Sequence, residues 1–155
     1  MIDIKQHSQS LVDLVKSSEG CKLSAYLDTN GIPTIGYGAT YYKDGTKVKI
    51  GDIITQQEAE DLLNYHLTVY DNHVTQIVTT KINQNQYNAL VDFCYNCGMH
   101  MLDISTLLRK VNSNPNDPTI ALEFNKWIYD QKKNKLPGLV TRRAKEVELY
   151  FKNVE

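Results

Sequence analysis

The feature that most restricts the fold of this chain is a change of sequence pattern between residues 22 and 50. Before it, Leu11, Leu14 and Val15 recur at helical spacing. Within it, short β-prone pieces are interrupted by an Asn-Gly step at 30–31 and an Asp-Gly step at 44–45, which favour tight turns. The pattern predicts a small antiparallel sheet of two or three strands inside an otherwise helical chain.

Helical periodicity returns at Thr55. Thr55 and Glu58 have the spacing of a capping box, in which a hydroxyl and a carboxylate each bind a free backbone N–H. An apolar stripe follows it, made of Leu62, Leu63, His66, Leu67, Tyr70, Val74 and Ile77. We therefore expect a long helix from Thr55 to about Val78.

The rest of the chain is expected to be helical. The predicted helices begin near Asn83 and end before Gly98, run from about Ser105 to Val111, extend from Asp117-Pro118 through Trp127, and follow Gly138 through Phe151. The fold class is thus α+β and mostly helical. The expected single domain of residues 1–155 has a small α/β lobe at about 15–54, a connecting helix at 55–80, and a helical lobe of 81–155 with the N-terminal segment. A cleft between the lobes is the expected ligand site.

Composition narrows the class of protein. The 155 residues are 41% hydrophobic and 23% charged, which is ordinary for a globular domain. No apolar run approaches the roughly 20 residues that cross a bilayer, so no membrane span is expected. The segment Met1–His7 lacks the apolar core of a secretory signal, so synthesis in the cytoplasm is expected. Cys21, Cys94 and Cys97 are expected to be free structural thiols, with neither a metal nor a cofactor.

Charge is distributed unevenly along the chain. Between Glu58 and Asp103 the only basic residue is Lys81, whereas the later part is rich in lysine and arginine. Such a basic region either meets an anionic polymer, such as a cell wall or a nucleic acid, or forms a solvated helical surface. No nucleic-acid-binding motif accompanies it, and no nucleic-acid partner is expected.

Two carboxylates and a hydroxyl in the β-rich part carry candidate chemistry. Glu19 precedes Gly20, a helix stop, so it is expected in a last helical turn, where the negative end of the helix dipole favours the protonated form. Asp28 lies in a turn rich in hydrogen-bond donors and is expected to stay charged. With Thr34, these groups are the parts that hydrolyse an acetal: one carboxyl donates a proton, and the other activates water or stabilises a cationic transition state.

The surrounding residues carry a resemblance to a known family. Glu19–Asp28 (EGCKLSAYLD) and Gly31–Gly38 (GIPTIGYG) closely resemble the signature of phage-type lysozymes, E-G-x-x-L-x-x-Y-x-D-x-x-G-x-x-T-I-G-x-G. Every fixed position of that pattern is present. The resemblance continues through Asn88–Gly98, Ser105–Lys110 and Leu136–Arg143, so that it covers nearly the whole chain in order.

The resemblance implies an endolysin with a lysozyme-like fold, a glycoside hydrolase that cleaves the β-1,4 bond between N-acetylmuramic acid and N-acetylglucosamine in peptidoglycan. In that family the residue matching Glu19 is the general acid. The residue matching Asp28 positions or activates water, and the one matching Thr34 helps to hold it. Attack of water on the opposite face of the sugar is the inverting route.

The resemblance also places residues around the substrate. Arg143 matches an arginine that pairs with the catalytic glutamate in relatives. Tyr95 and Thr106 match positions that touch sugar, and Tyr37 and Asn96 are expected nearby as substrate-binding or supporting residues. The alternative reading of Tyr95 is a core residue.

Two other functions fit the same sequence. A lytic transglycosylase acts on the same polymer and needs an acid but no water-activating carboxylate, so Asp28 with Thr34 favours hydrolysis. An inactive lysozyme-fold binding module is the second, and the intact set of polar residues speaks against it. A monomer is expected, which would act on the wall in the periplasm after passing a membrane lesion made by a holin, or after delivery by a secretion system.

Overall fold

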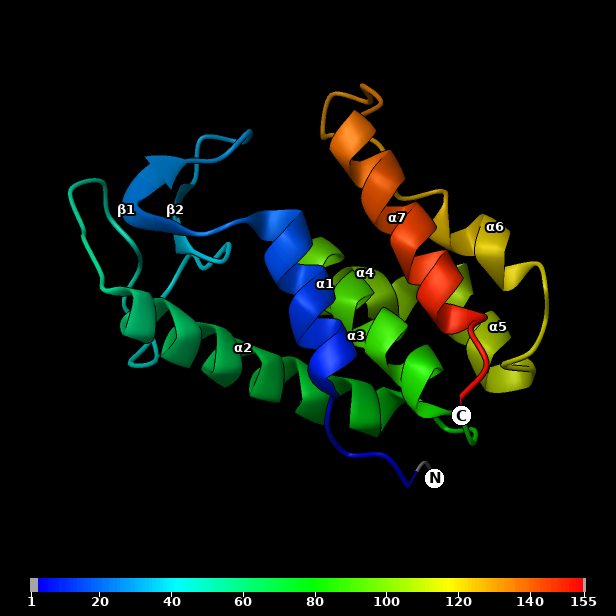
Figure 1. Cartoon of the computed structure of the whole chain (residues 1–155). Coiled ribbons are helices and arrows are strands. Elements are labelled where there is room, and N and C mark those ends of the chain that lie inside the picture. Colours follow the sequence, from blue (N-terminus) through cyan, green and yellow to red (C-terminus); the bar gives the residue numbers. More distant parts are fainter. Residues whose placement is uncertain (1–2, 155) are drawn as a thin grey trace. The chain divides into compact units, whose positions relative to one another are not determined.

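The structure, a computed structural model, describes residues 3–154; Met1 and Ile2 of the N-terminal segment considered above, and Glu155, lie outside the described residues. The contacts divide the chain into two compact units. One is Val15–Val69, and the other joins the described residues up to Leu14 with those from Tyr70 onward. The elements in chain order (Figure 1) are α1 (Gln9–Glu19), β1 (Lys22–Leu27), β2 (Pro33–Gly36), α2 (Gln56–Ile77), α3 (Gln84–Cys97), α4 (Met99–Ile104), α5 (Thr106–Ser113), α6 (Ile120–Phe124) and α7 (Pro137–Tyr150).

The small sheet has two antiparallel strands, as the turn sequences predicted. Tyr26 pairs with Thr34, and the register is irregular between Lys22 and Tyr26. In that irregular stretch β1 turns to a different neighbour, because Ser24 forms a bridge with Ile53. Bulges of this kind re-aim side chains and are frequent beside active sites.

The capping box at the start of α2 is formed. The Glu58 N–H donates to the Thr55 hydroxyl at 3.1 Å, and the Thr55 N–H donates to the Glu58 carboxylate at 3.1 Å. The helix then runs to Ile77, which confirms the predicted length. Its residues up to Val69 belong to the first unit and the rest to the second.

In the second unit, α3 supplies much of the core. It begins at a capping box of Asn83 and Gln86, and every residue from Gln86 to Cys94 is buried. α3 packs along α7 (Figure 1). Phe93 makes edge-to-face contacts with Phe124 and Trp127, with ring centroids 5.9 and 5.4 Å apart.

Three local predictions in this unit need correction. α6 ends at Phe124, so Trp127 is not helical. The chain tightens there into three-residue turns, since the Trp127 N–H donates to the Phe124 carbonyl, and the apolar spacing outlasts the helix. α4 was not predicted, and α7 begins at Pro137, so that Gly138 lies within its first turn.

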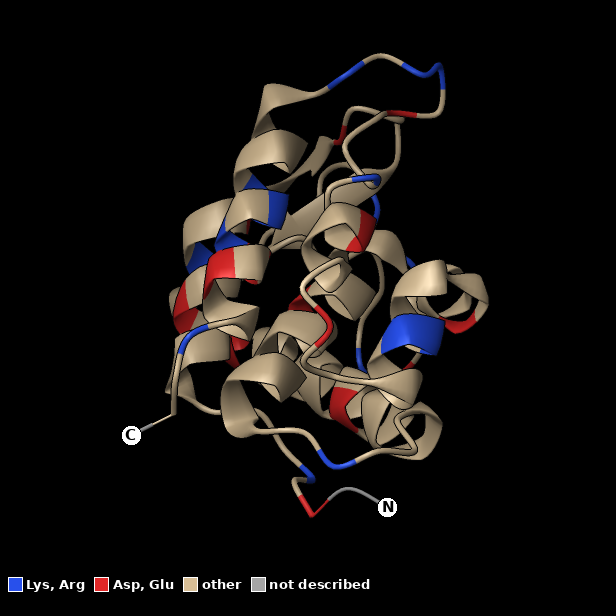
Figure 2. Cartoon of the chain, turned by 90° about the vertical axis from the view of Figure 1, so that its right-hand side faces the viewer, with Lys and Arg blue, Asp and Glu red and all other residues tan. Residues whose placement is uncertain are grey.

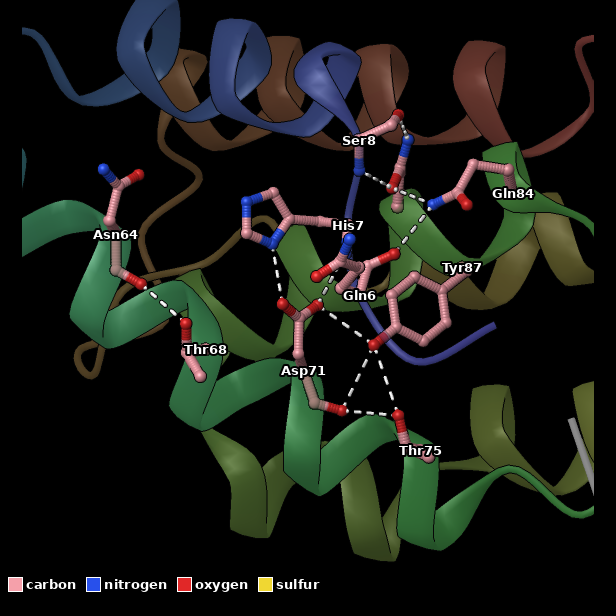
Figure 3. Close-up of polar contacts among 10 residues, drawn as sticks. Gln6, His7, Ser8, Asn64, Thr68, Asp71, Thr75, Gln84 and Tyr87 are labelled. Atoms are coloured by element: carbon pink, nitrogen blue, oxygen red, sulfur yellow. Dashed lines mark hydrogen bonds and ion pairs between the residues drawn. The ribbon is translucent and has the colours of Figure 1, made fainter. Parts of the chain in front are cut away.

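The segment before α1 is fixed to α2 and α3 within the same unit (Figure 3). Both the backbone N–H and the ring Nδ1 of His7 reach the carboxylate of the buried Asp71, at 3.0 and 2.7 Å. The Tyr87 hydroxyl donates to that carboxylate at 3.0 Å. Asp71 thus satisfies three donors, which holds the N-terminal segment in place.

Part of the basic charge of the C-terminal region is neutralised internally. Arg142 donates to both oxygens of the Asp92 carboxylate, at 3.0 and 2.8 Å, and both side chains are buried. Lys110 and Lys126 both pair with Glu123, at 2.8 and 2.7 Å. Figure 2 shows acidic residues interspersed with basic ones along the helix that leads to the C-terminus. These pairs favour a structural use of the charges over a uniform basic face.

No helix within residues 3–154 combines the length and the apolarity of a membrane-spanning segment.

Candidate active site

Glu19 is the last residue of α1, as predicted. Gly20 ends the helix with a φ of +67°, and its N–H donates to the Lys16 carbonyl at 3.0 Å. The half-buried Glu19 side chain lies against Gly38, which follows β2. A Cβ at Gly38 would lie 2.7 Å from the Glu19 Oε2 atom, so only glycine leaves room for the carboxyl group.

Gly38 belongs to a tight reversal between Ile35 and Ala39. These two residues exchange backbone hydrogen bonds at 2.9 Å in both directions, and Gly36 and Gly38 have φ values of +64° and +90°. The reversal brings backbone without a side chain up to the end of α1. Gly38 of the signature therefore has a spatial role in seating Glu19.

Asp28 is held in one orientation by its own turn. Its Oδ1 atom accepts hydrogen bonds from the N–H groups of Asn30 and Ile32, at 2.8 and 2.9 Å. The turn is closed by the Asp28 N–H, which donates to the Ile32 carbonyl at 3.0 Å. Among the described residues, nothing hydrogen-bonds the Oδ2 atom, so one carboxylate oxygen remains available.

Thr34 is connected to the same carbonyl. Its hydroxyl donates to the Ile32 carbonyl at 2.8 Å, and the residue is only 4% exposed. Since that carbonyl also accepts from the Asp28 N–H, the two predicted residues are tied to one acceptor atom. The hydroxyl proton is thereby used, and the lone pairs of Thr34 can only accept.

Tyr26 was not singled out from the sequence, yet it lies among these groups. It pairs with Thr34 across the strands, and it is two residues before Asp28. Burial, the Glu19 carboxyl and the Asp28 carboxyl, in that order, raise the pKa of its phenol. The signal that could have found it is its place in the signature, where it is a fixed position two residues before Asp28.

Tyr37 is buried and connected to α2 by hydrogen bonds. It is 8% exposed, and its hydroxyl donates to Glu60 at 3.0 Å while accepting from Gln56. Glu60 also pairs with Lys16 at 2.7 Å, and this lysine is in the last turns of α1. The network fastens the glycine reversal and the end of α1 to α2, and it suits a supporting role for Tyr37.

The other four predicted residues belong to the second unit. Arg143 is fully buried and contacts Asn96, Cys97 and Glu146, with its guanidinium 5.2 Å from the Phe93 ring centroid. Tyr95 is half-buried and packs edge-to-face on Tyr70, and Thr106 accepts a hydrogen bond from Arg109 at 2.8 Å. Their roles toward Glu19 and toward sugar, like the predicted cleft between lobes, stay predictions.

A separate cavity in the first unit does not include the predicted residues. It has a volume of about 430 Å³, and its lining includes Tyr42, Ile54, Glu58, Leu62 and Tyr65. Glu58, Leu62 and Tyr65 share one face of α2, whereas Gln56 and Glu60, which hold Tyr37, lie on the opposite face. The cavity is thus on the other side of α2 from the Tyr37 network.

The cysteines are free, and Cys94 is completely buried. Burial raises the pKa of the Cys94 thiol to about 12, so the thiol form dominates. Within residues 3–154, no three His, Cys, Asp or Glu side chains lie together in a way that could hold a metal ion.

A small two-stranded sheet in a mostly helical chain, with one carboxyl group at a helix end and a second fixed in a turn, is the arrangement expected of the lysozyme class. The description "Phage lysozyme" belongs to the family model that matches residues 16–146. The chain belongs to the phage lysozyme family.

Relatives and solved structures agree. The endolysin of Acyrthosiphon pisum secondary endosymbiont phage 1 is 38% identical over 88% of this chain and 92% of its own length. That of Salmonella phage P22 is 36% identical over 94% and 98%. The structure of an endolysin from Escherichia coli O157:H7 phage FAHEc1 is 34% identical, covers 96% of this chain and 95% of its own, and matches with a TM-score of 0.88. These matches confirm the fold class and support a role in cell-wall lysis.

Proposed function

We propose that the chain is an endo-N-acetylmuramidase that hydrolyses the β-1,4 bond between N-acetylmuramic acid and N-acetylglucosamine in peptidoglycan. Glu19 is the general acid, and Asp28 and Thr34 hold the attacking water. The observation that carries this assignment is the shared Ile32 carbonyl, which ties Asp28 and Thr34 together in fixed hydrogen-bonding states.

The position proposed for the attacking water follows from the hydrogen bonds that Asp28 and Thr34 already make. With the Asp28 Oδ1 atom occupied by two N–H groups, the Oδ2 atom is left to accept one water proton. The Thr34 hydroxyl donates its own proton to the Ile32 carbonyl, so the Thr34 Oγ1 atom is left to accept the second water proton. A water that donates both protons in this way presents its lone pair to the anomeric carbon, and Asp28 takes a proton as the bond forms.

The acid step uses Glu19. Glu19 is the last residue of α1, and its half-buried carboxyl group lies against the backbone of Gly38. The proton passes to the glycosidic oxygen as the bond to the sugar breaks. Two carboxyl groups with a water beside one of them fit the inverting route, for which separations of about 6.5–9.5 Å are usual.

A lytic transglycosylase needs no held water and leaves anhydromuramyl ends, and an inactive binding module leaves no cleaved product at all. The pre-set acceptors at Asp28 and Thr34 favour hydrolysis over both. Access to the wall would come through a membrane lesion made by a holin, or through a secretion system, and we propose that the protein acts there as a monomer.

The test compares wild type with Glu19→Gln and Asp28→Asn on purified peptidoglycan. Removal of either group should slow cleavage by about 10²–10⁴-fold, the usual contribution of an acid or a base. Asp61→Asn is the matched control, because this exposed carboxylate of α2 accepts only from Gln57 among the described residues, and its activity should be that of wild type.

Mass spectrometry and NMR of the products complete the test. Reducing ends formed first in the α configuration indicate inverting hydrolysis. Anhydromuramyl ends would establish the transglycosylase instead. Equal cleavage by wild type and Glu19→Gln would refute the assignment of the acid.

A further inference from the structure

The side chain of Tyr26 has a place in the site that the reaction above leaves unused. On β1 it lies directly across from Thr34, and Asp28 follows two residues later. Paired residues on antiparallel strands have Cβ atoms about 4.5–5.5 Å apart on the same face, and residues i and i+2 share that face. Strand pairing therefore groups Tyr26 with Thr34, and Asp28 lies in the turn that begins directly after β1.

The electrostatic surroundings of Tyr26 also involve Glu19, the third residue of the proposed site. Glu19, from the end of α1, and Asp28 are the two charged groups that act on the Tyr26 phenol. In glycoside hydrolysis the sugar that reacts lies between the acid and the second carboxyl group. With the function proposed above, the half-buried Tyr26, which lies across from Thr34, borders the space in which that sugar binds.

The state of the phenol fixes what it can offer. Burial and the two nearby carboxyls raise its pKa above the ordinary value of 10, so it keeps its proton throughout the neutral range. Among the described residues, no group forms a hydrogen bond with the Tyr26 hydroxyl. A neutral O–H donor without an internal acceptor, in a site where both neighbouring carboxyls have other tasks, is suited to an oxygen atom of the ligand.

We propose that the Tyr26 hydroxyl donates a hydrogen bond to an oxygen atom of the pyranose that lies between Glu19 and Asp28. The proposal rests on the function proposed above. It makes Tyr26 a further substrate-contacting residue, whose ring forms one wall of the sugar site and whose hydroxyl fixes the sugar relative to the held water.

The test is Tyr26→Phe, which removes only the hydroxyl. Loss of one neutral hydrogen bond should lower kcat/KM on soluble peptidoglycan strands by about 3–10-fold. The thermal unfolding midpoint should not change, because the hydroxyl has no partner within the described residues. The matched control is Tyr65→Phe, since Tyr65 is a half-buried tyrosine of the same unit that lines the separate cavity, and it should retain wild-type kcat/KM.

A binding measurement separates this proposal from the catalytic one. In the Glu19→Gln background, adding Tyr26→Phe should weaken the Kd for a muramyl oligosaccharide by a similar 3–10-fold. Unchanged kcat/KM and Kd would overturn the role of Tyr26. So would a loss of activity that follows a lowered unfolding midpoint while the Kd stays constant, because the hydroxyl would then be structural. Neither result bears on Glu19, whose own variants test the reaction.

Discussion

The contact between Gly38 and Glu19 predicts a sharp effect of a single added methyl group. In Gly38→Ala the new Cβ would lie 2.7 Å from Glu19 Oε2 and 3.0 Å from its Cδ, whereas ordinary contacts begin at 3.4 Å. The carboxyl group must therefore move by about 0.7 Å. Misplacement of a catalytic group by about 1 Å costs on the order of 10²-fold in rate, so kcat should fall by roughly 10–100-fold.

The Gly38→Ala substitution also strains the backbone. The same substitution at Gly45 measures the effect of backbone strain alone. Gly38 has a φ of +90°, and Gly45 has a φ of +88° with nothing within 4 Å of an added Cβ. Each alanine variant should lose about 1–3 kcal/mol of stability. At about 2–4 °C per kcal/mol, that lowers the unfolding midpoint by roughly 2–12 °C in both. Only Gly38→Ala should lose kcat.

Calorimetry and initial rates on peptidoglycan, measured well below the unfolding transition, provide the comparison. If both variants lost similar stability and Gly38→Ala kept the wild-type kcat, the argument that Gly38 seats the Glu19 carboxyl would be wrong. A matching loss of kcat in Gly45→Ala would point to general strain instead.

Three further predictions concern stability and reactivity. Thr55→Ala removes the hydroxyl of the α2 capping box and should cost about 1 kcal/mol without changing kcat, as urea unfolding and rate measurements can check; an unchanged midpoint would refute the contribution of the cap. Burial, and then the neighbouring Asp92 carboxylate, raise the pKa of Glu146 well above its ordinary value, so the native state binds this proton more tightly than the unfolded chain. Stability from this group is therefore lost as pH rises above its ordinary pKa of 4.5, and Glu146→Gln should reduce that loss, whereas parallel stability curves would contradict it. Cys94, fully buried with a pKa of about 12, should react with iodoacetamide only after unfolding, while the half-exposed Cys21 reacts in the native protein; mass spectrometry distinguishes the two sites.

Local chemistry made several elements predictable. The hydroxyl of Thr55 and the carboxylate of Glu58 predict the start of α2. Gly20 predicts the end of α1, because a residue in the left-handed conformation stops a helix. The Asn-Gly step at 30–31 gives the turn that orients Asp28. In each case a few neighbouring residues hold both partners of the interaction, so the sequence contains the whole cause.

What could not be predicted depends on partners distant in sequence or on subtle backbone changes. The helix of Trp127 was expected from apolar spacing, but a shift to three-residue turns at Phe124 keeps that spacing without a helix. The sharing of the Ile32 carbonyl by the Asp28 N–H and the Thr34 hydroxyl depends on the exact backbone path of the turn, which the residue types alone do not specify. Tyr26 belongs to the signature, but a tyrosine in a β-prone stretch is ordinarily a packing residue, so its identity alone does not indicate a contact with the substrate.

The compact unit Val15–Val69 contains Glu19, Asp28 and Thr34 together. Recombination with breakpoints on either side of this stretch would therefore transfer all three proposed catalytic groups, and the turn that orients Asp28, as one segment.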